Sequence, residues 1–503
     1  MLTRRNLLRA FALAPVVGAL GPLGTRALSA TSWKRAFDSA LAENPRLLGW
    51  LGVTEPRLAA PNLPVTGALP PGLTGTFYRN GPARHERAGH RYRHWFDGDG
   101  MVQAFRFDEG NVSHQGRIIE TAKYMAEERA GRHRFPAFGT TGRDSPPLRG
   151  PDDLNTANIS ICHHGGELLA LWEGGSAHRI EASTLETLGR KTWSEDLKGI
   201  AFSAHPKAEP DGTLWNFGNV VSRGLLVLYH IASNGRFRKT GAVPVEHLGM
   251  VHDFVVTARH LVFVLPPLVY DETAFGPNVS FLDSHVWRPE LDTRVLVVAK
   301  DDFSDRRWYR LPAGFAFHFG NAWEDPTGNI HFDYCAAPDA TVLTETLRYV
   351  MRGEFRPPTE PTRFAQVTLN ASGDAVQDIS SVSAEFPRVA PAVVGRRYRQ
   401  VYALTGGAET SGLGRVARID IEAGLADSFD YGDRFIPEEH VFVPRRGAAD
   451  ETDGWLVGTA LDLRERVTRI SVFDASRLAD GPLAWAALPY PLPLGFHGTF
   501  VPA

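Results

Sequence analysis

Four histidines of this chain share one kind of setting, and together they could hold a metal ion. His205 lies in "AFSAHPK", His252 in "MVHDFVVT", His318 in "FAFHFGNAWE" and His497 in "GFHGTFVPA", close to the C-terminus. The first three each open a unit in which a short segment, a turn and an apolar strand follow. Neutral imidazoles suit Fe, Zn, Cu or Ni rather than Mg or Ca. Four of them on an octahedral Fe(II) ion would leave two positions open, for dioxygen and a substrate or water.

No local motif can bring these histidines together, because dozens of residues or more separate each from the next. Strand-like runs separated by turn residues recur along the chain, with a spacing typical of propeller blades. A propeller sends the first strand of each blade toward a common axis, where histidines at the starts of different inner strands would converge. Helical periodicity is rare, and residues 341–353 are the best helix candidate. We therefore predict an all-β propeller.

The composition fits a closed β architecture and excludes several classes of function. A chain of 503 residues exceeds the usual size of one compact core, but propellers grow by adding blades around an axis. The formal net charge of -3 gives no long-range attraction to nucleic acid or anionic lipid. The two cysteines, Cys162 and Cys335, provide neither a disulfide framework nor a cysteine-based zinc site, although one bond between them stays open. A metal would therefore be held by histidine or carboxylate.

The first 30 residues have the pattern of an export signal. Arg4 and Arg5 precede an apolar run over residues 10–20, and small residues follow at 27–30. The run is too short to span a bilayer, and "TRRNLLR" resembles a twin-arginine signal. The alternative is a disordered or amphipathic N-terminal arm. We expect export to the periplasm, a soluble mature protein, and a single β-propeller domain with cap insertions over residues 31–503.

Two further segments, "GTFYRNGPA" (75–83) and "HWFDGDGMVQAFRF" (94–107), complete a pattern typical of one family. Together with the four histidine segments, they resemble the carotenoid cleavage oxygenases, non-haem iron enzymes that include lignostilbene oxygenases and the retinoid isomerohydrolase. The resemblance runs from about residue 50 to the end of the chain. It implies a seven-bladed β-propeller with a helical and loop cap over the metal face. It also implies one Fe(II) ion held by the four histidines, with dioxygen as co-substrate.

The resemblance further assigns three glutamates to the surroundings of the metal ligands: Glu173 in "LALWEGG", Glu385 in "AEFPRV" and Glu439 in "EEHVFVPR". Each would accept the second N–H of a ligand histidine, which orients the ring and raises its basicity. Taken alone, each would be interpreted as a surface carboxylate. Glu438 competes with Glu439 for this role, and His205 has no partner that we can assign.

Other polar residues with suggestive neighbours are given structural roles. Asp97 and Asp99 in "FDGDGM" lie between glycines, so a tight turn with the carboxylates bonded back to the backbone is favoured over a metal or acid–base pair. Ser160 has histidines nearby in "NISICHH", but no nucleophile elbow surrounds it. Cleavage of a double bond by dioxygen on Fe(II) requires no side-chain nucleophile, which agrees with these assignments.

The resemblance implies oxidative cleavage of a conjugated C=C bond of a carotenoid or apocarotenoid, giving aldehyde or ketone products. The alternative substrate is a lignostilbene or hydroxystilbene, because Lys123 in "RIIETAKYMAEE" stands where stilbene-cleaving members place a lysine near a phenol oxygen. A charge-assisted hydrogen bond would favour a phenol over a hydrocarbon, although a surface lysine is the favoured interpretation. Two other functions stay open: Lewis-acid isomerisation or ester cleavage on the same iron, and a non-enzymatic ligand-binding β-propeller whose histidines are structural.

Residues 269–290 form a long segment without a clear period, which we interpret as a functional loop or lid. Aromatic residues beside the histidines, such as Phe317 and Phe496, suit packing against an extended π system or plain propeller core packing. The expected partner is a hydrophobic small molecule, and no nucleic acid is expected. The sequence leaves open the oligomeric state and a peripheral membrane contact through 269–290 and 341–353.

Overall fold

The computed structural model describes residues 30–142, 145–274, 279–406, 412–448 and 450–503. The expected export signal at residues 1–30 lies outside these ranges except for its last residue. None of the helices within the ranges is long and apolar enough to span a bilayer.

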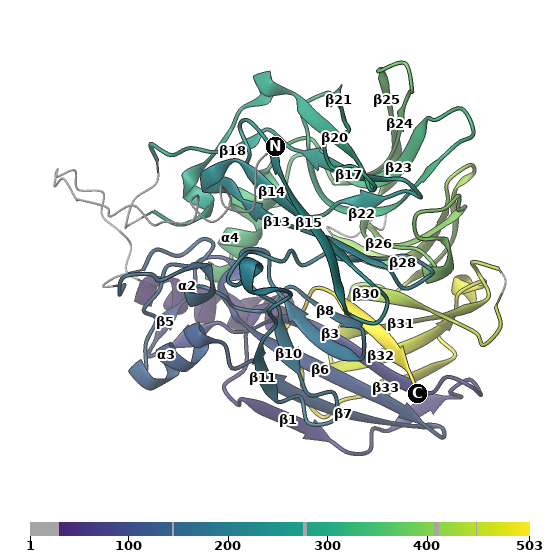
Figure 1. The fold of residues 1–503 in the computed structure, drawn as a ribbon. Coiled ribbons are helices and arrows are strands. Elements are labelled where there is room, and N and C mark those ends of the chain that lie inside the picture. The colour runs from purple at the N-terminus through teal and green to yellow at the C-terminus, as the bar shows by residue number, and fades with distance from the viewer. Residues whose placement is uncertain (1–29, 143–144, 275–278, 407–411, 449) are drawn as a thin grey trace.

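Seven antiparallel sheets of four or five strands are arranged as the blades of a seven-bladed β-propeller, which confirms the predicted fold class (Figure 1). We number the blades 1 to 7 along the chain and list the strands of each in hydrogen-bonded order, ending at the axis. The last strand of each blade is the innermost, because residues of these seven strands line one central cavity.

Blade 1 contains β1 (Arg57–Ala60), β7 (Asn111–Ile118), β6 (Asp99–Asp108), β3 (Gly75–Arg84) and β34 (Gly498–Pro502). Blade 2 contains β11 (Thr187–Arg190), β10 (His178–Ile180), β9 (Glu167–Leu171) and β8 (Ser160–His164). Blade 3 contains β15 (Phe237–Pro244), β14 (Leu225–Ile231), β13 (Leu214–Val220) and β12 (Lys207–Ala208). Blade 4 contains β21 (Arg306–Leu311), β20 (Thr293–Ala299), β17 (His260–Leu265) and β16 (Val255–Val256).

Blade 5 contains β25 (Ala375–Ser383), β24 (Arg363–Leu369), β23 (Ile330–Ala337) and β22 (Phe315–Glu324). Blade 6 contains β29 (Gly424–Asp430), β28 (Leu413–Asp420), β27 (Gln400–Gly406) and β26 (Glu385–Arg388). Blade 7 contains β2 (Val65–Gly67), β33 (Ala484–Ala487), β32 (Val467–Asp474), β31 (Gly454–Asp462) and β30 (Phe435–Pro444).

Both ends of the described chain help to close the ring. The C-terminal strand β34 pairs with β3, from Gly75 opposite Pro502 to Arg79 opposite Gly498. The early strand β2 pairs with β33 and so becomes the outer edge of blade 7. Closure through strands from both ends leaves no blade incomplete, and it places the C-terminal tail at the axis. The tail is therefore a structural part of the centre of the molecule.

The hydrophobic core is divided among the contacts between neighbouring blades. Blades 1 and 7 share one cluster that includes Phe77, Phe105 and Trp455, and blades 3 and 4 share another that includes Phe217 and Phe254. Apolar residues on facing sides of adjacent sheets interdigitate, as in other packed sheets. Because each blade packs mainly against its neighbours, stability is spread around the ring and does not depend on any single central contact.

A cap of helices and loops covers one face of the propeller and encloses the largest hydrophobic cluster (Figure 1). It includes α2 (Ala30–Glu43), α3 (Ala122–Ala130), the short hairpin β4 (Glu86–Arg87) and β5 (His90–Arg91), and the pair β18 (Leu268–Tyr270) and β19 (His285–Trp287). The expected helix at 341–353 is present as a π-helical turn (Val342–Thr346), α4 (Leu347–Tyr349) and a 3₁₀ turn (Val350–Arg352). The 269–290 segment lies in the β18–β19 part of this cap, and its residues 275–278 are outside the described ranges.

Candidate metal centre

The four histidines identified in the sequence come together at the propeller axis. His205 and His252 lie just before the innermost strands β12 and β16, His318 lies within β22, and His497 immediately precedes β34. One nitrogen of each ring lies within 4.8 Å of the corresponding nitrogen of the others, and three of the residues are buried, His205 being half-buried. The ring closure that buries the C-terminal tail is thus what delivers the fourth histidine.

The spacing of these rings indicates that they share one bound ion. The Nε2 atoms are 3.0 Å apart in His205 and His252, 3.2 Å in His252 and His318, and 3.1 Å in His318 and His497. In His252, His318 and His497, Nδ1 faces a carboxylate and carries the proton, so Nε2 presents a lone pair. Lone pairs facing one another at these distances repel unless a cation lies between them. The donor set therefore fits a transition-metal ion that accepts imidazole ligands.

Each of the three predicted glutamates contacts a different histidine of the cluster. The pairs are Glu173 with His252, Glu385 with His318 at 2.5 Å, and Glu439 with His497 at 2.8 Å, in each case through Nδ1. In the described part of the chain, no hydrogen bond or ion pair joins the ring of His205 to a carboxylate. The carboxylates hold the rings with Nε2 pointing to the centre, which is the usual arrangement around ligand histidines.

Glu439 is the most firmly held of the three glutamates. It accepts hydrogen bonds from His497, from the backbone N–H of Gly498 and from two guanidinium nitrogens of Arg388, all at 2.8 Å. Its neighbour Glu438 instead forms a buried ion pair with Arg79. The hydrogen bonds thus distinguish the two adjacent glutamates, and only Glu439 touches a histidine of the cluster.

Burial keeps two histidines of the cluster neutral, whereas a neighbouring carboxylate favours the protonated form of a third. Burial lowers the pKa of His497 to about 4, partly offset by Glu439, and lowers the pKa of His205 well below its ordinary value. Both rings are therefore neutral at pH 7. Burial also acts to lower the pKa of His252, but the charge and hydrogen bond of Glu173 outweigh it and raise the pKa overall. Burial acts to raise the pKa of Glu439. The charges and hydrogen bonds of Arg388 and His497 outweigh burial and lower this pKa below its ordinary value, so the carboxylate stays ionised.

An apolar cavity of about 120 Å³ lies beneath the cap and reaches Glu173, the carboxylate that contacts His252. Its walls include Phe96, Phe138, Ile159, Trp172 and Met250. Phe281, at its edge, is 39% exposed and packs against Phe138 with ring centroids 5.6 Å apart. Phe317 contacts the ring of His252 and also Phe96, so aromatic surface continues from the cavity to the histidines. Such a lining favours a flat, apolar ligand.

Lys123 does not lie on the surface, so the favoured surface interpretation was wrong. Its side chain is fully buried, with the ammonium 3.0 Å from Glu127, 3.5 Å from Asp99 and in contact with the hydroxyl of Tyr92. Lys123 lines neither the apolar cavity nor the cavity at the axis. Its carboxylate partners and the ring of Tyr92 compensate the burial of this lysine in helix α3.

The carboxylates of "FDGDGM" have structural partners. Asp97 accepts hydrogen bonds from the backbone of His94 and Gly139 and from Thr140, which bonds the turn back to the backbone as predicted. Asp99, by contrast, forms a buried ion pair with Arg87 at 2.6 Å. The hydroxyl of Ser160 donates to the backbone carbonyl of Ala204. None of these groups reaches the histidine cluster through a described hydrogen bond.

Comparison with known proteins agrees with this arrangement. The model of the retinal pigment epithelial membrane protein family matches residues 53–502. The chain belongs to this family of carotenoid cleavage oxygenases. It is 30% identical over 470 residues to apocarotenoid-15,15'-oxygenase of Synechocystis, covering 87% of this chain and 92% of that protein. It is also 30% identical to lignostilbene-alpha,beta-dioxygenase isozyme III of Sphingomonas paucimobilis, covering 92% of this chain and 99% of that protein.

Solved structures of oxygenases from this family have the same fold. The structure of cobalt-substituted Synechocystis ACO superimposes with a TM-score of 0.82 at 27% identity, covering 92% of this chain and 99% of that one. The Pseudomonas brassicacearum lignostilbene dioxygenase gives a TM-score of 0.82 at 26% identity, with the same coverage. Relatives associated with both substrate types therefore share this propeller, so the fold alone does not choose between them.

Two residues that organise the centre were not identified from the sequence. Arg388 binds Glu439 and also donates to the carbonyl oxygen of Gly498 at 3.0 Å, which ties the tail to blades 6 and 7. Asp253, next to His252, accepts from the backbone N–H of Phe319, the residue after His318. Their position within motif segments was the available signal, three residues after Glu385 in "EFPR" and directly after His252 in "VHDF".

Proposed function

We propose that this carotenoid cleavage oxygenase uses one Fe(II) ion and dioxygen to cleave a conjugated C=C bond of a carotenoid or apocarotenoid. The two oxygen atoms of O₂ end in two carbonyl products, aldehydes or ketones. The observation that carries the proposal is the meeting of four imidazoles, three of them backed by glutamates, next to an apolar cavity. The relatives support it, among them carotenoid 9,10(9',10')-cleavage dioxygenase 1 of Phaseolus vulgaris, which is 28% identical over 93% of this chain.

The protein's own contribution to the reaction is positioning and the exclusion of water. The four histidines would hold the ion through neutral nitrogens, and the glutamates keep the Nδ1 protons in place. Iron(II), when bound, supplies the activation of dioxygen that side chains cannot provide. The aromatic walls bind the polyene and keep water from the reacting bond. No side chain has to act as an acid, a base or a nucleophile.

Substrate binding would require the apolar cavity to widen. A volume of about 120 Å³ is below the range of roughly 300–1,000 Å³ usual for ligand pockets. Phe281 is the most exposed residue of the lining, so we propose that its ring turns away from Phe138 and that the polyene enters there. Phe96, Ile159 and Met250 on the other walls are buried in the core under the cap.

The proposal is tested by metal analysis and product analysis on the purified protein. The iron-loaded protein is incubated with a panel of apocarotenals and hydroxystilbenes under ¹⁸O₂, and products are identified by mass spectrometry. We expect one iron per chain, oxygen consumption, and cleavage products that carry label in both carbonyl groups. Isomerised or hydrolysed products without oxygen consumption would replace this function by Lewis-acid chemistry. A protein without bound metal after loading would leave only a ligand-binding propeller.

A hydroxystilbene is the second candidate substrate, and the 30% identity to lignostilbene-alpha,beta-dioxygenase isozyme III is the observation that favours it. Lys123 could give a phenol a charge-assisted hydrogen bond only if the phenol displaced one of its buried partners, because Lys123 lines neither described cavity. Lys123→Met alone would remove the nearer of two cations that face Glu127, Lys123 at 3.0 Å and Arg87 at 3.3 Å, so the double variant with Glu127→Gln is the suitable test. We expect a large loss of hydroxystilbene turnover and a small loss of apocarotenal turnover. Equal losses on both substrates would remove Lys123 from substrate recognition.

We also propose export by the twin-arginine route, on the pattern around Arg4 and Arg5. Replacing both arginines by lysine in the full-length chain should retain the protein in the cytoplasm, as measured by cell fractionation. Periplasmic protein at the wild-type level would contradict this route.

Peripheral membrane contact through the cap is a further proposal, supported by the exposed apolar side chains of Phe281, Val286 and Phe355. Such contact would let the enzyme draw a lipid-dissolved substrate toward the cavity. Zwitterionic vesicles should co-sediment the wild-type protein and release a Phe281→Ser, Val286→Ser double variant. Equal sedimentation of both proteins would contradict the contact.

A further inference from the structure

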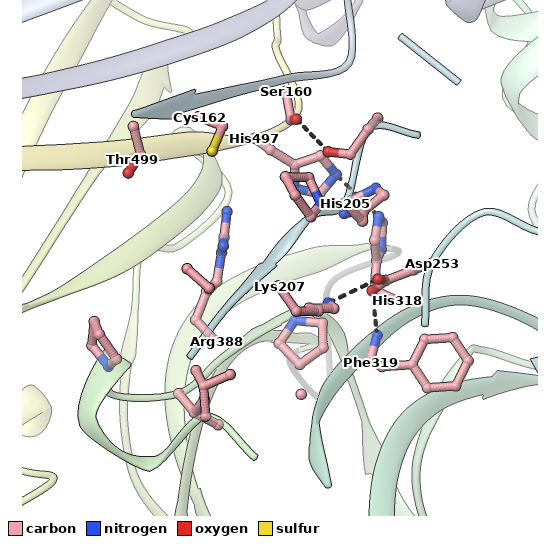
Figure 2. Close-up of a pocket in the computed structure, with 18 of the residues that line it drawn as sticks. Ser160, Cys162, His205, Lys207, Asp253, His318, Phe319, Arg388, His497 and Thr499 are labelled. Carbon is pink, nitrogen blue, oxygen red and sulfur yellow. Dashed lines mark hydrogen bonds and ion pairs between the residues drawn. The ribbon is translucent and has the colours of Figure 1, made fainter. Parts of the chain in front are cut away.

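A second cavity, of about 280 Å³, reaches the histidine cluster along the propeller axis (Figure 2). It touches three of the clustered histidines, His205, His318 and His497, and its walls come from the innermost strands of all seven blades. It shares no described lining residue with the apolar cavity beneath the cap. His163 and Ala208 on its wall are exposed, so the cavity is open to solvent.

The axial cavity is the more polar of the two. Its walls combine apolar residues with charged groups such as Lys207, Asp253 and Arg388, whereas aromatic and aliphatic side chains dominate the other cavity. Lys207 and Asp253 form an ion pair at 2.8 Å, visible in Figure 2. Asp253 is 3% exposed and also accepts backbone N–H groups of Phe254 and Phe319. Its carboxylate is therefore fixed independently of the lysine.

The charges around the inner end of the axial cavity favour a divalent cation. Four carboxylates surround the histidines, namely Glu173, Glu385, Glu439 and Asp253. Two cations face them, Arg388 and Lys207. With neutral imidazoles this set has an excess of two negative charges, which one divalent ion would balance.

We propose that the metal ion reaches the histidines from solvent through this axial cavity while the cap stays closed. The inference rests on the proposed metal centre. A hydrated divalent ion can exchange its water for the polar groups of the axial walls, whereas an aromatic cavity offers no replacement. Lys207 limits the rate of metal uptake, because its positive charge cancels the negative charge of Asp253 on the path of the ion. The apolar cavity is left to the organic substrate.

The test measures the rate at which metal-free protein takes up Co(II), followed by the absorbance of the bound ion in stopped flow. Thr499→Trp narrows the axial cavity at β34, and Thr499→Val is the matched control of similar size. We expect Thr499→Trp to slow uptake by about tenfold or more, because the ion must then wait for the protein to open. The final stoichiometry of one ion per chain should not change.

A second variant tests the charge on the path without filling it. Lys207→Gln should accelerate uptake by about fivefold at low salt, the factor for a divalent ion passing a unit charge at roughly 8 Å in water. High salt should reduce this gain. The exposed Lys198→Gln is the control and should leave the rate unchanged.

The outcomes separate the path from the site. If the wild-type protein binds no Co(II) at equilibrium, the metal centre itself is refuted. If binding is complete but neither Thr499→Trp nor Lys207→Gln changes the rate, the axial path is overturned. If Phe281→Trp at the edge of the apolar cavity slows uptake instead, the ion enters beneath the cap. Should Thr499→Trp fail to fold, the rate and salt dependence of Lys207→Gln decide the question.

Discussion

Replacing Glu439 by glutamine should weaken metal binding more than the same change at Glu173. Glu439 accepts four hydrogen bonds, including those from His497 and Arg388, and is fully enclosed. A glutamine at position 439 has a single oxygen, which can accept from donors on one side only. Its NH₂ group must then face one of the remaining donors. Glu173 has His252 as its described partner and its side chain is 21% exposed, so a glutamine there can keep its oxygen on the ring.

The magnitude follows from these contacts. Loss of a carboxylate behind a ligand histidine typically costs 10–100-fold in metal affinity, roughly 1.4–2.8 kcal/mol. For Glu173→Gln we expect the lower end, about tenfold. For Glu439→Gln we expect about 100-fold, because a donor facing a donor in a buried site adds a penalty of about 1–3 kcal/mol. The guanidinium of Arg388 would also lose its counter-charge close to the ion.

The assay is a competitive chelator titration of the metal-free protein with Co(II), accompanied by thermal unfolding of the metal-free form. Asp462→Asn is the matched control, because Asp462 is an equally buried carboxylate that binds Arg434 and Arg469 away from the cluster. It should lower thermal stability without changing metal affinity. Wild-type affinity in Glu439→Gln, or a greater loss in Glu173→Gln, would refute the reasoning from hydrogen-bond geometry.

Three further results are expected. His252→Ala or His497→Ala should abolish metal loading while circular dichroism shows an intact propeller, because the blades carry their own cores; a variant that loads fully would contradict the ligand assignment. Burial lowers the pKa of His114 to about 3, so only the unfolded chain takes up this proton as pH falls below about 6.5. Between pH 7 and pH 5, the free energy of unfolding measured in urea should therefore fall by about 2 kcal/mol less for His114→Gln than for the wild type. An equal fall in both proteins would refute the lowered pKa of His114. Val251→Trp should fill the apolar cavity and lower kcat/KM for a polyene at unchanged metal content, whereas normal turnover would place the substrate elsewhere.

The propeller and the histidine set could be predicted because their signals are strong and separate. Each histidine lies in a distinct segment, and the family resemblance joins the segments. The early strand β2 joins the last blade, and the C-terminal strand β34 joins the first. No local sequence pattern predicts this arrangement, because it depends on the closure of the whole ring. The burial of Lys123 was missed for a similar reason. Its nearer partner Glu127 lies four residues further along the same helix, but Asp99 comes from β6, and nothing in the sequence of α3 indicates the contact with Asp99.

The choice between Glu438 and Glu439 could not be made from the sequence, because it depends on a bulge. In a regular strand, adjacent residues point to opposite faces. The pairing of β30 with β31 shifts register between Pro437 and His440, and both glutamates are buried within that shift. Bulges redirect side chains, and they are common next to active sites. Here the irregularity lets two neighbouring carboxylates serve the same tail.

Those two carboxylates fix the tail on both sides of its histidine. Glu438 accepts the backbone N–H of Gly495 at 2.9 Å, while Glu439 holds the ring of His497 and the N–H of Gly498. The strand β26 has a comparable register shift after Glu385. In both blades the glutamate that contacts a histidine therefore lies where alternation fails. The alternation of side chains along a strand identifies the blades. The orientation of the ligand histidines, however, is set by glutamates at the positions where that alternation is broken.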